Sequence, residues 1–417
     1  MPEYRLPDLP VDDGAALTPE ERRQAARACK GMLLRQEVYA DDGSPLQALP
    51  FSTAEHGCRV RLVQPQMANR YAVFLTHESE ALEHQYERDP ADPRVSHTLN
   101  TALDDLGNVL ESATVTYGRL TADATLPPEV QQAQARLLIS YSAHLFTNDV
   151  LDDARYRLRQ PCEVRRYELT GAVPAAGRFT LAEIQAAFQG ASGLGYEQAL
   201  HAGFIEKRLL DHQRTVYAGD ADPNLPLPFA ALQPLGLHYE NYALTLTPSL
   251  LTALYGARVD PAMLAEGRFL LGDDAVASGR FPATDPGGLV WTASGIVQYP
   301  AHPEQHFYLP ERFIDAAGTA TTVRYYADYH LMVDRTEDAL GNRVTVEAFD
   351  FRFLLPWRTR DINDNLVEAA FDISGRVVGT AVLGKGAEAD DLGGFAADLT
   401  DAQVAAFLAD PVGAGPA

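Results

Sequence analysis

The clearest pattern of hydrophobic and polar positions lies in residues 315–384. Short runs there, such as 322–325 and 343–346, carry β-branched or aromatic residues at every second position. Alternation of this kind is typical of β-strands with one buried face. The sequence therefore predicts a series of antiparallel hairpins in this part of the chain.

The predicted hairpins share one turn pattern: an Asp, two residues, Gly or Asp, and one polar residue. We expect the Asp side chain to bond its own backbone and Gly or Asn to take the positive φ of the turn. The last four copies begin 23, 23 and 11 residues apart, a spacing typical of a repeat sheet. The five copies are Asp104, Gly107 and Asn108; Asp315, Gly318 and Thr319; Asp338, Gly341 and Asn342; Asp361, Asp364 and Asn365; and Asp372, Gly375 and Arg376.

The rest of the chain predicts more strands and a few capped helices. Strands are predicted over 33–39, 56–65, 70–76, 97–103, 109–117, 136–146, 162–169 and 204–217, although 136–146 and 204–217 are also compatible with helix. Helices are predicted over 18–31, 180–189, 247–256 and 400–408, and Thr18, Thr180 and Thr400 begin capping boxes. Residues 126–134, 190–195 and 223–234 are predicted to be links or loops, and 289–299 and 304–313 lead back to the repeats.

No break in composition divides the chain, so we expect a mainly β protein with one continuous sheet-rich body and a few short inserted helices. The predicted segments are a lead-in with a capped helix (1–31), a β-rich region (32–302), hairpin repeats (303–384) and a linker with a short helix (385–417). Neither end shows a terminating element, so we expect both ends to be cuts through a longer sheet.

Composition limits the partners. The 34 basic and 57 acidic residues give a net charge of −23, which repels nucleic acid and anionic lipid and keeps a large β surface soluble. No apolar run approaches about 18 residues, so we expect no membrane span. The N-terminus lacks the features of a signal peptide, so the chain is expected to be made in the cytoplasm and exported by another route. Cys29, Cys58 and Cys162 follow no metal or disulfide pattern.

Two metal sites are weighed and set aside. Asp361, Asn363, Asn365 and Asp372 match ligand positions of a calcium loop, but Leu366 stands where that loop needs Gly. Two successive hairpin turns explain the same residues, and weak calcium binding stays open. His302 and His306 have the spacing of a helical zinc site, but Pro303 and the following aromatic residues argue against a helix.

Catalytic patterns are weak. Residues 190–195 lack the arrangement of a nucleophile elbow, and 384–386 lack the glycines of a phosphate loop. A histidine–carboxylate base is possible in 55–97, but nothing there identifies a nucleophile. We expect no enzyme, cofactor or metal, and surface hydrogen bonding for the residues of that stretch, which are His56, His77, His84, His97, Glu55, Glu78 and Glu83.

Several longer blocks resemble the middle-to-C-terminal part of the B component (TcdB-like) of bacterial insecticidal toxin complexes, the Tc toxins. The resemblance runs over about residues 4–411. The blocks are 33–40 (LLRQEVYA), 84–94 (HQYERDPADPR), 105–110 (DLGNVL), 161–171 (PCEVRRYELTG), 177–180 (GRFT), 305–310 (QHFYLP) and 378–382 (VGTAV).

The resemblance implies an extended, curved antiparallel sheet of RHS/YD-type hairpin repeats that forms part of a hollow shell. In that family the B and C components enclose the cytotoxic end of the C component, and a B-component β-propeller docks onto the A-component pore. The resemblance thus implies a structural virulence role, a C-component partner with its toxin domain, and release as part of a secreted complex. This sequence shows no preceding propeller and is expected to be only a segment of shell wall.

Two hypotheses therefore come from different classes. The first is a non-enzymatic shell segment. The second is an RHS-like surface module that binds carbohydrate or protein, with Trp291 and Trp357 as aromatic platforms.

Overall fold

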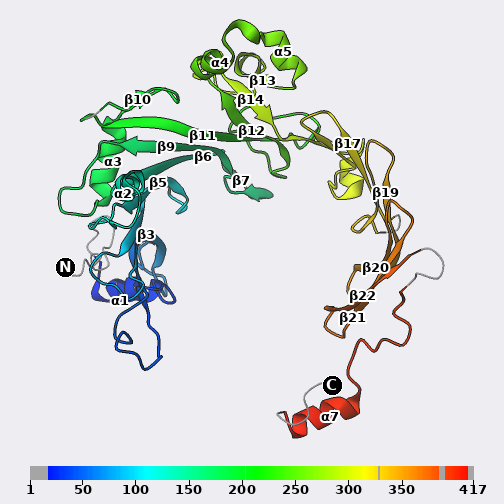
Figure 1. Ribbon diagram of the computed structural model, residues 1–417. Coiled ribbons are helices and arrows are strands. Elements are labelled where there is room, and N and C mark those ends of the chain that lie inside the picture. The colour runs from blue at the N-terminus through cyan, green and yellow to red at the C-terminus, as the bar shows by residue number, and fades with distance from the viewer. Residues whose placement is uncertain (1–16, 202, 327–328, 385–389, 412–417) are drawn as a thin grey trace. The chain divides into compact units, whose positions relative to one another are not determined.

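The computed structural model describes residues 17–201, 203–326, 329–384 and 390–411 (Figure 1). It is mostly β, with 39% of residues in strands and 16% in helices, and its large sheets are antiparallel and do not close into a barrel. Two compact units divide the chain. The first unit takes its described residues from 1–216, 228–232 and 242–292, and the second from 217–227, 233–241 and 293–417.

The first unit is built largely on a twelve-stranded sheet in the order β1-β2-β3-β4-β5-β6-β9-β11-β12-β14-β13. The remaining strand, β10, pairs in parallel with β11. The strands are β1 (Arg35–Val38), β2 (Ser52–Gln64), β3 (Val73–Gln85), β4 (Arg94–Leu103), β5 (Val109–Tyr117), β6 (Leu138–Phe146), β9 (Pro161–Thr170), β10 (Ser192–Leu194), β11 (Glu206–Tyr217), β12 (His238–Leu246), β13 (Leu270–Leu271) and β14 (Val290–Ala293). A separate hairpin pairs β7 (Val150–Asp152) with β8 (Arg155–Arg157).

Helices accompany this sheet. They are α1 (Pro19–Ala28), α2 (Pro128–Gln134), α3 (Leu181–Gly190), α4 (Pro248–Tyr255), the 3-10 turn η2 (Gly256–Arg258), α5 (Pro261–Glu266) and α6 (Gly272–Ala277). Of these, α1, α3, α4 and α5 contribute residues to small apolar clusters.

The largest of these clusters lies between α3 and strands β4, β5, β6 and β9. Every second residue of β4 points inward, so Val95, His97 and Leu99 are buried. From α3, Ile184 and Phe188 complete the cluster, and the Phe188 ring stacks on Tyr141 of β6 with centroids 3.8 Å apart. Burial of apolar side chains on this scale is the main source of folding stability.

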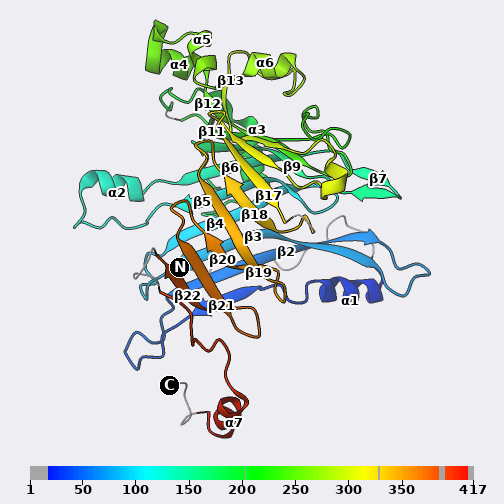
Figure 2. The same ribbon diagram turned by 90° about the vertical axis from the view of Figure 1, so that its right-hand side faces the viewer.

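The second unit is a meander of eight antiparallel strands, each bonded to its neighbour in the sequence, and Figure 2 shows β17 to β22 side by side. Among these strands, Val323, Phe371 and Ala381 are the buried apolar residues. The strands are β15 (Gly295–Gln298), β16 (Arg312–Asp315), β17 (Ala320–Tyr325), β18 (Val333–Glu337), β19 (Arg343–Asp350), β20 (Leu355–Arg360), β21 (Leu366–Phe371) and β22 (Val377–Leu383). The unit also holds the 3-10 turn η3 (Pro303–His306) and helix α7 (Asp401–Ala409).

Most of the strands and helices predicted from the sequence are present. The capping boxes at Thr18, Thr180 and Thr400 all form, and they begin α1, α3 and α7. The two segments that were also compatible with helix, 136–146 and 204–217, form the strands β6 and β11. The mainly β fold class with a few short helices is confirmed.

Other predictions of local structure are wrong. The link predicted at 126–134 contains α2, because Pro128 supplies a favourable first turn. The flexible link predicted at 190–195 contains β10, which is held by pairing with β11. Pro303 does not prevent a helical turn, since it occupies the first position of η3, where no backbone donor is needed.

The strand predicted at 70–76 runs on to Gln85, and the pattern missed β7, β8, β12, β13, α5 and α6. The expected single continuous body is also wrong in one respect, because the strands form two large sheets. The four predicted segments, 1–31, 32–302, 303–384 and 385–417, stay a prediction, and residues 1–16 of the lead-in lie outside the described residues.

Candidate functional site: sheet edges, histidine pairs and a buried ion cluster

The five Asp turns have one geometry. In the turn between β18 and β19, Asp338 Oδ1 accepts from the backbone N–H groups of Leu340 and Asn342, both at 2.9 Å. Its other carboxylate oxygen accepts from the Asn342 side chain at 2.8 Å. The hydrogen bond from the Asn342 side chain, followed by those from backbone N–H groups, lowers the pKa of Asp338. In all five turns the Asp side chain accepts from the backbone N–H of the last turn residue, and in the turns that begin at Asp104, Asp338 and Asp361 it also accepts from the Asn side chain.

The fourth residue of each turn holds the positive φ. It is Gly107, Gly318, Gly341 and Gly375 in four turns, with φ between 80° and 88°. The turn that begins at Asp361 has Asp364 there, with φ 64°, so the positive φ falls on Asp364 and not on the expected Asn365. Asp tolerates this region better than most residues but at a cost that Gly avoids.

The 23, 23 and 11 spacing follows from the meander. The turns that begin at Asp315, Asp338 and Asp361 follow β16, β18 and β20. Two strands separate successive turns, so all three turns lie at the same end of the strands. Asp372 begins the turn after β21, one strand later, and therefore lies at the opposite end of the strands. In keeping with that, the turn residue Gly375 contacts the ring of Phe353, which belongs to the connection between β19 and β20. The role of the turn residues as structural turns of a repeat sheet stays a prediction.

The same topology bears on calcium. Asp361 and Asp372 stand at opposite ends of β21, a strand of six residues, which spans about 20 Å. The side chain of Asp361 is already bonded to Asn363 and Asn365. The four residues of the loop pattern therefore do not converge on a common ion.

One histidine of β2 and one of β4 pair with glutamates of β3. His56 Nδ1 lies 2.7 Å from Glu78 Oε2, and His97 Nε2 lies 3.1 Å from Glu80 Oε2. The ring of His97 is fully buried, so a substrate cannot reach it. Glu80 was not among the residues singled out from the sequence, and only the β3–β4 register brings it to His97.

The remaining members of that stretch have other neighbours. His84 stacks on Tyr86, and His77 lies opposite Arg59 in the register of β2 and β3. Glu55 pairs with Arg35, and Glu83 lies opposite Ser96 of β4. The structure does not assemble these residues into one site, and the absence of enzymatic activity stays a prediction.

The two histidines with the spacing of a zinc site, His302 and His306, have different contacts. His302 lies beside Glu304 at 3.5 Å, whereas the ring of His306 packs against that of His330, with centroids 5.0 Å apart. Within the described residues, no group of three or more His, Cys, Asp or Glu residues could hold a metal ion.

The structure contains a buried ion cluster that was not predicted from the sequence. Arg214 of β11 is 1% exposed, and its guanidinium donates to Glu163 of β9 at 2.7 Å and to both carboxylate oxygens of Asp285. The Arg214 Cζ atom lies 4.9 Å from the Trp291 ring centroid, and His212 Nε2 lies 2.7 Å from the same Glu163 carboxylate. These residues are 163, 212, 214, 285 and 291 in the sequence, and no local motif connects them.

The cluster has a definite charge state. Burial by itself would raise the pKa of Glu163, but hydrogen bonds from His212 and Arg214 and the charges of Arg165 and Arg214 hold that pKa at about 2. Burial lowers the pKa of His212, although Glu163 opposes this effect. Glu163 is therefore ionised and His212 neutral near pH 7. The contacts bind the segment around Asp285 to the sheet and leave no reactive group exposed.

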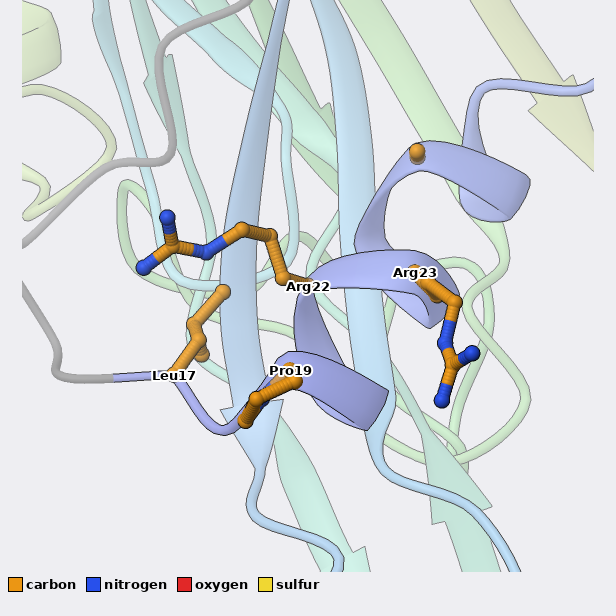
Figure 3. A pocket seen from close by; sticks show the side chains of 5 residues that line it. Leu17, Pro19, Arg22 and Arg23 are labelled. Atoms are coloured by element: carbon orange, nitrogen blue, oxygen red, sulfur yellow. The ribbon is translucent and has the colours of Figure 1, made fainter.

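Pockets in the described residues are shallow and carry little chemistry. An open pocket of about 640 Å³ beside α1 is lined by Leu17, Pro19, Arg22 and Arg23, and the two arginines point away from each other (Figure 3). A pocket of about 400 Å³ in the second unit is lined by Trp357 among other residues. Trp291 is fully buried, so the expectation that it serves as an exposed binding platform is wrong.

Comparison with known proteins gives one family match. Residues 24–158 match the family described as the insecticide toxin TcdB middle/C-terminal region. No curated protein sequence matches the chain significantly.

Solved structures match over most of the chain. A chain of the Photorhabdus luminescens Tc holotoxin pore has 23% identity and a TM-score of 0.66, and the match covers 90% of this chain. The crystal structure of TcdB2–TccC3 has 24% identity and a TM-score of 0.65, and that of TcdB2–TccC3–TEV has 25% identity and a TM-score of 0.65, each with 88% of this chain covered.

In each of these structures the match covers 17% of the other chain, so the present chain spans about a sixth of the length of the proteins it resembles. Residues 24–158 are therefore similar to the middle/C-terminal region of TcdB, and over most of its length the chain shares the fold of chains in Tc toxin structures.

Proposed function

We propose that this chain is a structural wall segment of a Tc toxin B component, which together with a C component encloses and helps deliver a cytotoxic polypeptide. It acts as a container and not as an enzyme. The observation that carries the proposal is that 88–90% of the chain, including both large sheets, matches chains from a Tc holotoxin and from TcdB2–TccC3.

The physical form of the second unit suits a wall. Its sheet is a single layer in which each strand bonds only to its sequence neighbours, so it can extend by adding strands. In its short turns the Asp side chains accept hydrogen bonds from backbone N–H groups of the same turn, so the turns require no support from a core. A wall made of such hairpins separates two aqueous spaces without needing a thick apolar interior.

The proposed partners follow from the neighbours. TccC3 accompanies TcdB2 in the matched crystal structures, so we assign this chain a C-component partner of the same class together with its enclosed toxin domain. Contact with an A-component pore would be indirect, through a β-propeller of the B component. None of the helices in the described residues is long and apolar enough to cross a membrane. We place the protein in a secreted toxin complex that contributes to virulence.

Co-expression tests the container role. The chain is produced with a cognate C component and, separately, with a C component whose toxin domain is deleted. We expect the two proteins to co-elute in size-exclusion chromatography and the toxin domain to resist a protease concentration that degrades it when free. Co-elution without protection would show binding without enclosure, and loss of both would overturn the proposal.

A second function rests on the pocket at Trp357. Phe349, Phe351 and Phe371 line it beside the indole, which is the kind of surface that carbohydrate-binding modules use. A glycan array followed by titration of Trp357→Ala tests this alternative. Glycan binding that disappears in the variant would favour a surface binding module of the RHS type over a shell segment.

A further inference from the structure

One face of the eight-stranded sheet carries an unusual concentration of positive charge. The strand registers place Arg324 of β17 opposite Arg335 of β18, which lies opposite Thr345 of β19, which lies opposite Arg360 of β20. Side chains that are paired in register lie on the same face of a sheet. The full set, termed the arginine face, is Arg312, Arg324, Arg335, Arg343, Arg358 and Arg360.

This concentration stands out against the rest of the chain. Residues 293–417 contain nine Lys or Arg residues, so six of the nine lie on this one face. The whole chain has a net charge of −23.

Acidic residues of the same sheet neutralise part of the face. Arg343 pairs with Glu337 at 2.9 Å, Arg360 with Glu347 at 2.7 Å, and Arg358 with Glu368 at 3.5 Å. Arg312 donates to the side chain of Gln298 at 3.4 Å. Three glutamates thus serve six arginines, which leaves a net positive face.

The centre of the face is only partly neutralised. The pKa of Glu337 is lowered first by its hydrogen bond from Arg343 and also by the charges of Arg335 and Arg324, so this one carboxylate is shared among three arginines. Within the described residues, neither Arg324 nor Arg335 forms an ion pair, although the two are direct cross-strand neighbours. The Nε atom of Arg335 is buried and has no hydrogen-bond partner there. Like charges placed directly opposite each other destabilise a sheet, so the fold itself gains nothing from this pair.

Most of the face is accessible. Arg324 and Arg343 are exposed, and Arg335, Arg358 and Arg360 are half-buried. Phe395 packs over Gly379 of β22, on the same side of the sheet, and so covers only the β22 end. The arginines of β16 to β20 remain open on that side within the described residues.

We propose that the arginine face binds an acidic, extended segment of a partner polypeptide, with Arg324 and Arg335 at its centre. Guanidinium groups bind carboxylates through paired hydrogen bonds, and an extended peptide presents alternate side chains about 7 Å apart on one side. A long polyanion such as a nucleic acid would meet the repulsion of the chain's excess of acids, whereas a short acidic segment meets mainly the face. That the segment belongs to the C component or its cargo rests on the proposed function.

A defined peptide tests the inference with the full chain. Fluorescence anisotropy measures binding of a labelled peptide of about ten residues with alternating Glu and Ser, with a Lys/Ser peptide and a single-stranded oligonucleotide as comparisons. We expect binding of the Glu peptide alone at low salt, and its loss at about 0.5 M salt because exposed charges are then screened.

Variants locate the binding. The double variant Arg324→Gln and Arg335→Gln should weaken Glu-peptide binding about tenfold, which corresponds to about 1.4 kcal/mol. The control Arg352→Gln removes an arginine that is paired with Asp350 in the β19–β20 connection, away from the face, and should change nothing. Glu347→Gln frees Arg360 and should strengthen binding about threefold, which a purely structural role for these residues would not produce.

The outcomes separate this inference from the proposed function. Unchanged binding by the double variant, or equally tight binding of the Lys peptide or the oligonucleotide, overturns the arginine face as an acidic-peptide site. The double variant should melt no lower than the parent, since it relieves a like-charge contact, so weaker binding cannot come from unfolding. Glu-peptide binding without C-component co-elution would support the arginine face and refute the container role. Co-elution and protection without Glu-peptide binding would support the container role and refute the arginine face.

Discussion

In the first unit, Leu99, Val115 and Tyr141 are completely buried beneath α3, whereas in the second unit the strands β17 to β22 leave most residues of both faces at least partly exposed. The first unit also buries Arg214 with two carboxylates, while the second keeps its ion pairs on the surface. Two sheets in one chain therefore rely on different interactions: side-chain packing and buried charge in the first, and backbone pairing with self-satisfied turns in the second.

The two tryptophans allow each unit to be followed separately, because Trp291 lies in the first and Trp357 in the second. A Trp357→Phe background reports the first unit by fluorescence, and a Trp291→Phe background reports the second. The stability of each unit can thus be measured separately in these two backgrounds.

The largest effect is expected from Arg214→Met. The change leaves Asp285 buried without its cation and Glu163 with Arg165 as its remaining cation, and breaking a buried pair in this way costs about 3–5 kcal/mol. Urea unfolding followed at Trp291 should shift strongly, and that followed at Trp357 should shift little. Arg155→Met, at an exposed pair in β8, is the control. Equal shifts in the two units would show that they unfold as one and would break the comparison.

Packing gives the next effect. Leu99→Ala removes a fully buried side chain and should cost the first unit about 3 kcal/mol. Leu355→Ala, in β20, removes a side chain that is 39% exposed and should cost the second unit less than about 1 kcal/mol. Similar losses from the two substitutions would mean that the second unit has a core as important as the first.

Acid should act on the first unit through the ion cluster. The pKa of Glu163 is held at about 2 in the folded chain, below its ordinary value of 4.5, so its contribution is complete above pH 4.5 and is lost as the pH falls toward 2. The lowered pKa of His212 acts in the same direction, because a protonated ring favours the unfolded chain. Between pH 7 and pH 3 we expect the first unit to lose about 2 kcal/mol through this cluster.

The check is the urea midpoint of the Trp291 transition as a function of pH. Glu163→Gln should lower stability at pH 7 and flatten the fall below pH 4.5. An unchanged slope in that variant would assign the acid sensitivity to other groups.

The smallest effect sharpens the account of the second unit. Asp364→Gly should stabilise its turn by about 1 kcal/mol, and Gly341→Asp should destabilise the equivalent turn by a similar amount, because φ is positive at both positions. Thermal melting of each variant at Trp357 measures both changes. Two changes of the same sign would show that the turns are not equivalent.

Sequence reasoning succeeded where the signal is local. The Asp turns, the three capping boxes and the alternating strands depend on residues a few positions apart, and their chemistry can be read directly. It failed where distant pairing decides: Ser192–Leu194 is a strand only because it lies along Glu206–Arg208, and Arg214 meets Asp285 across 71 positions.

The candidate site divides in the same way. The turn residues could be named from the sequence, but the arginine face could not. Its members are spaced irregularly, and only the registers, with shifts between Arg324 and Tyr325 and around Ala348, bring them to one side. Register shifts of this kind leave no mark in a single sequence.

The 23-residue interval between the Asp turns has a consequence for how such a protein can change over generations. Duplication of one interval adds two strands and widens the sheet by about 10 Å. Every later turn then stays at its original end of the strands. Duplication of an 11-residue interval adds one strand and moves all later turns to the other end of the strands. Gene rearrangements in steps of 23 codons therefore enlarge the wall and keep every later turn at its original end of the strands, whereas steps of 11 codons move the later turns to the other end.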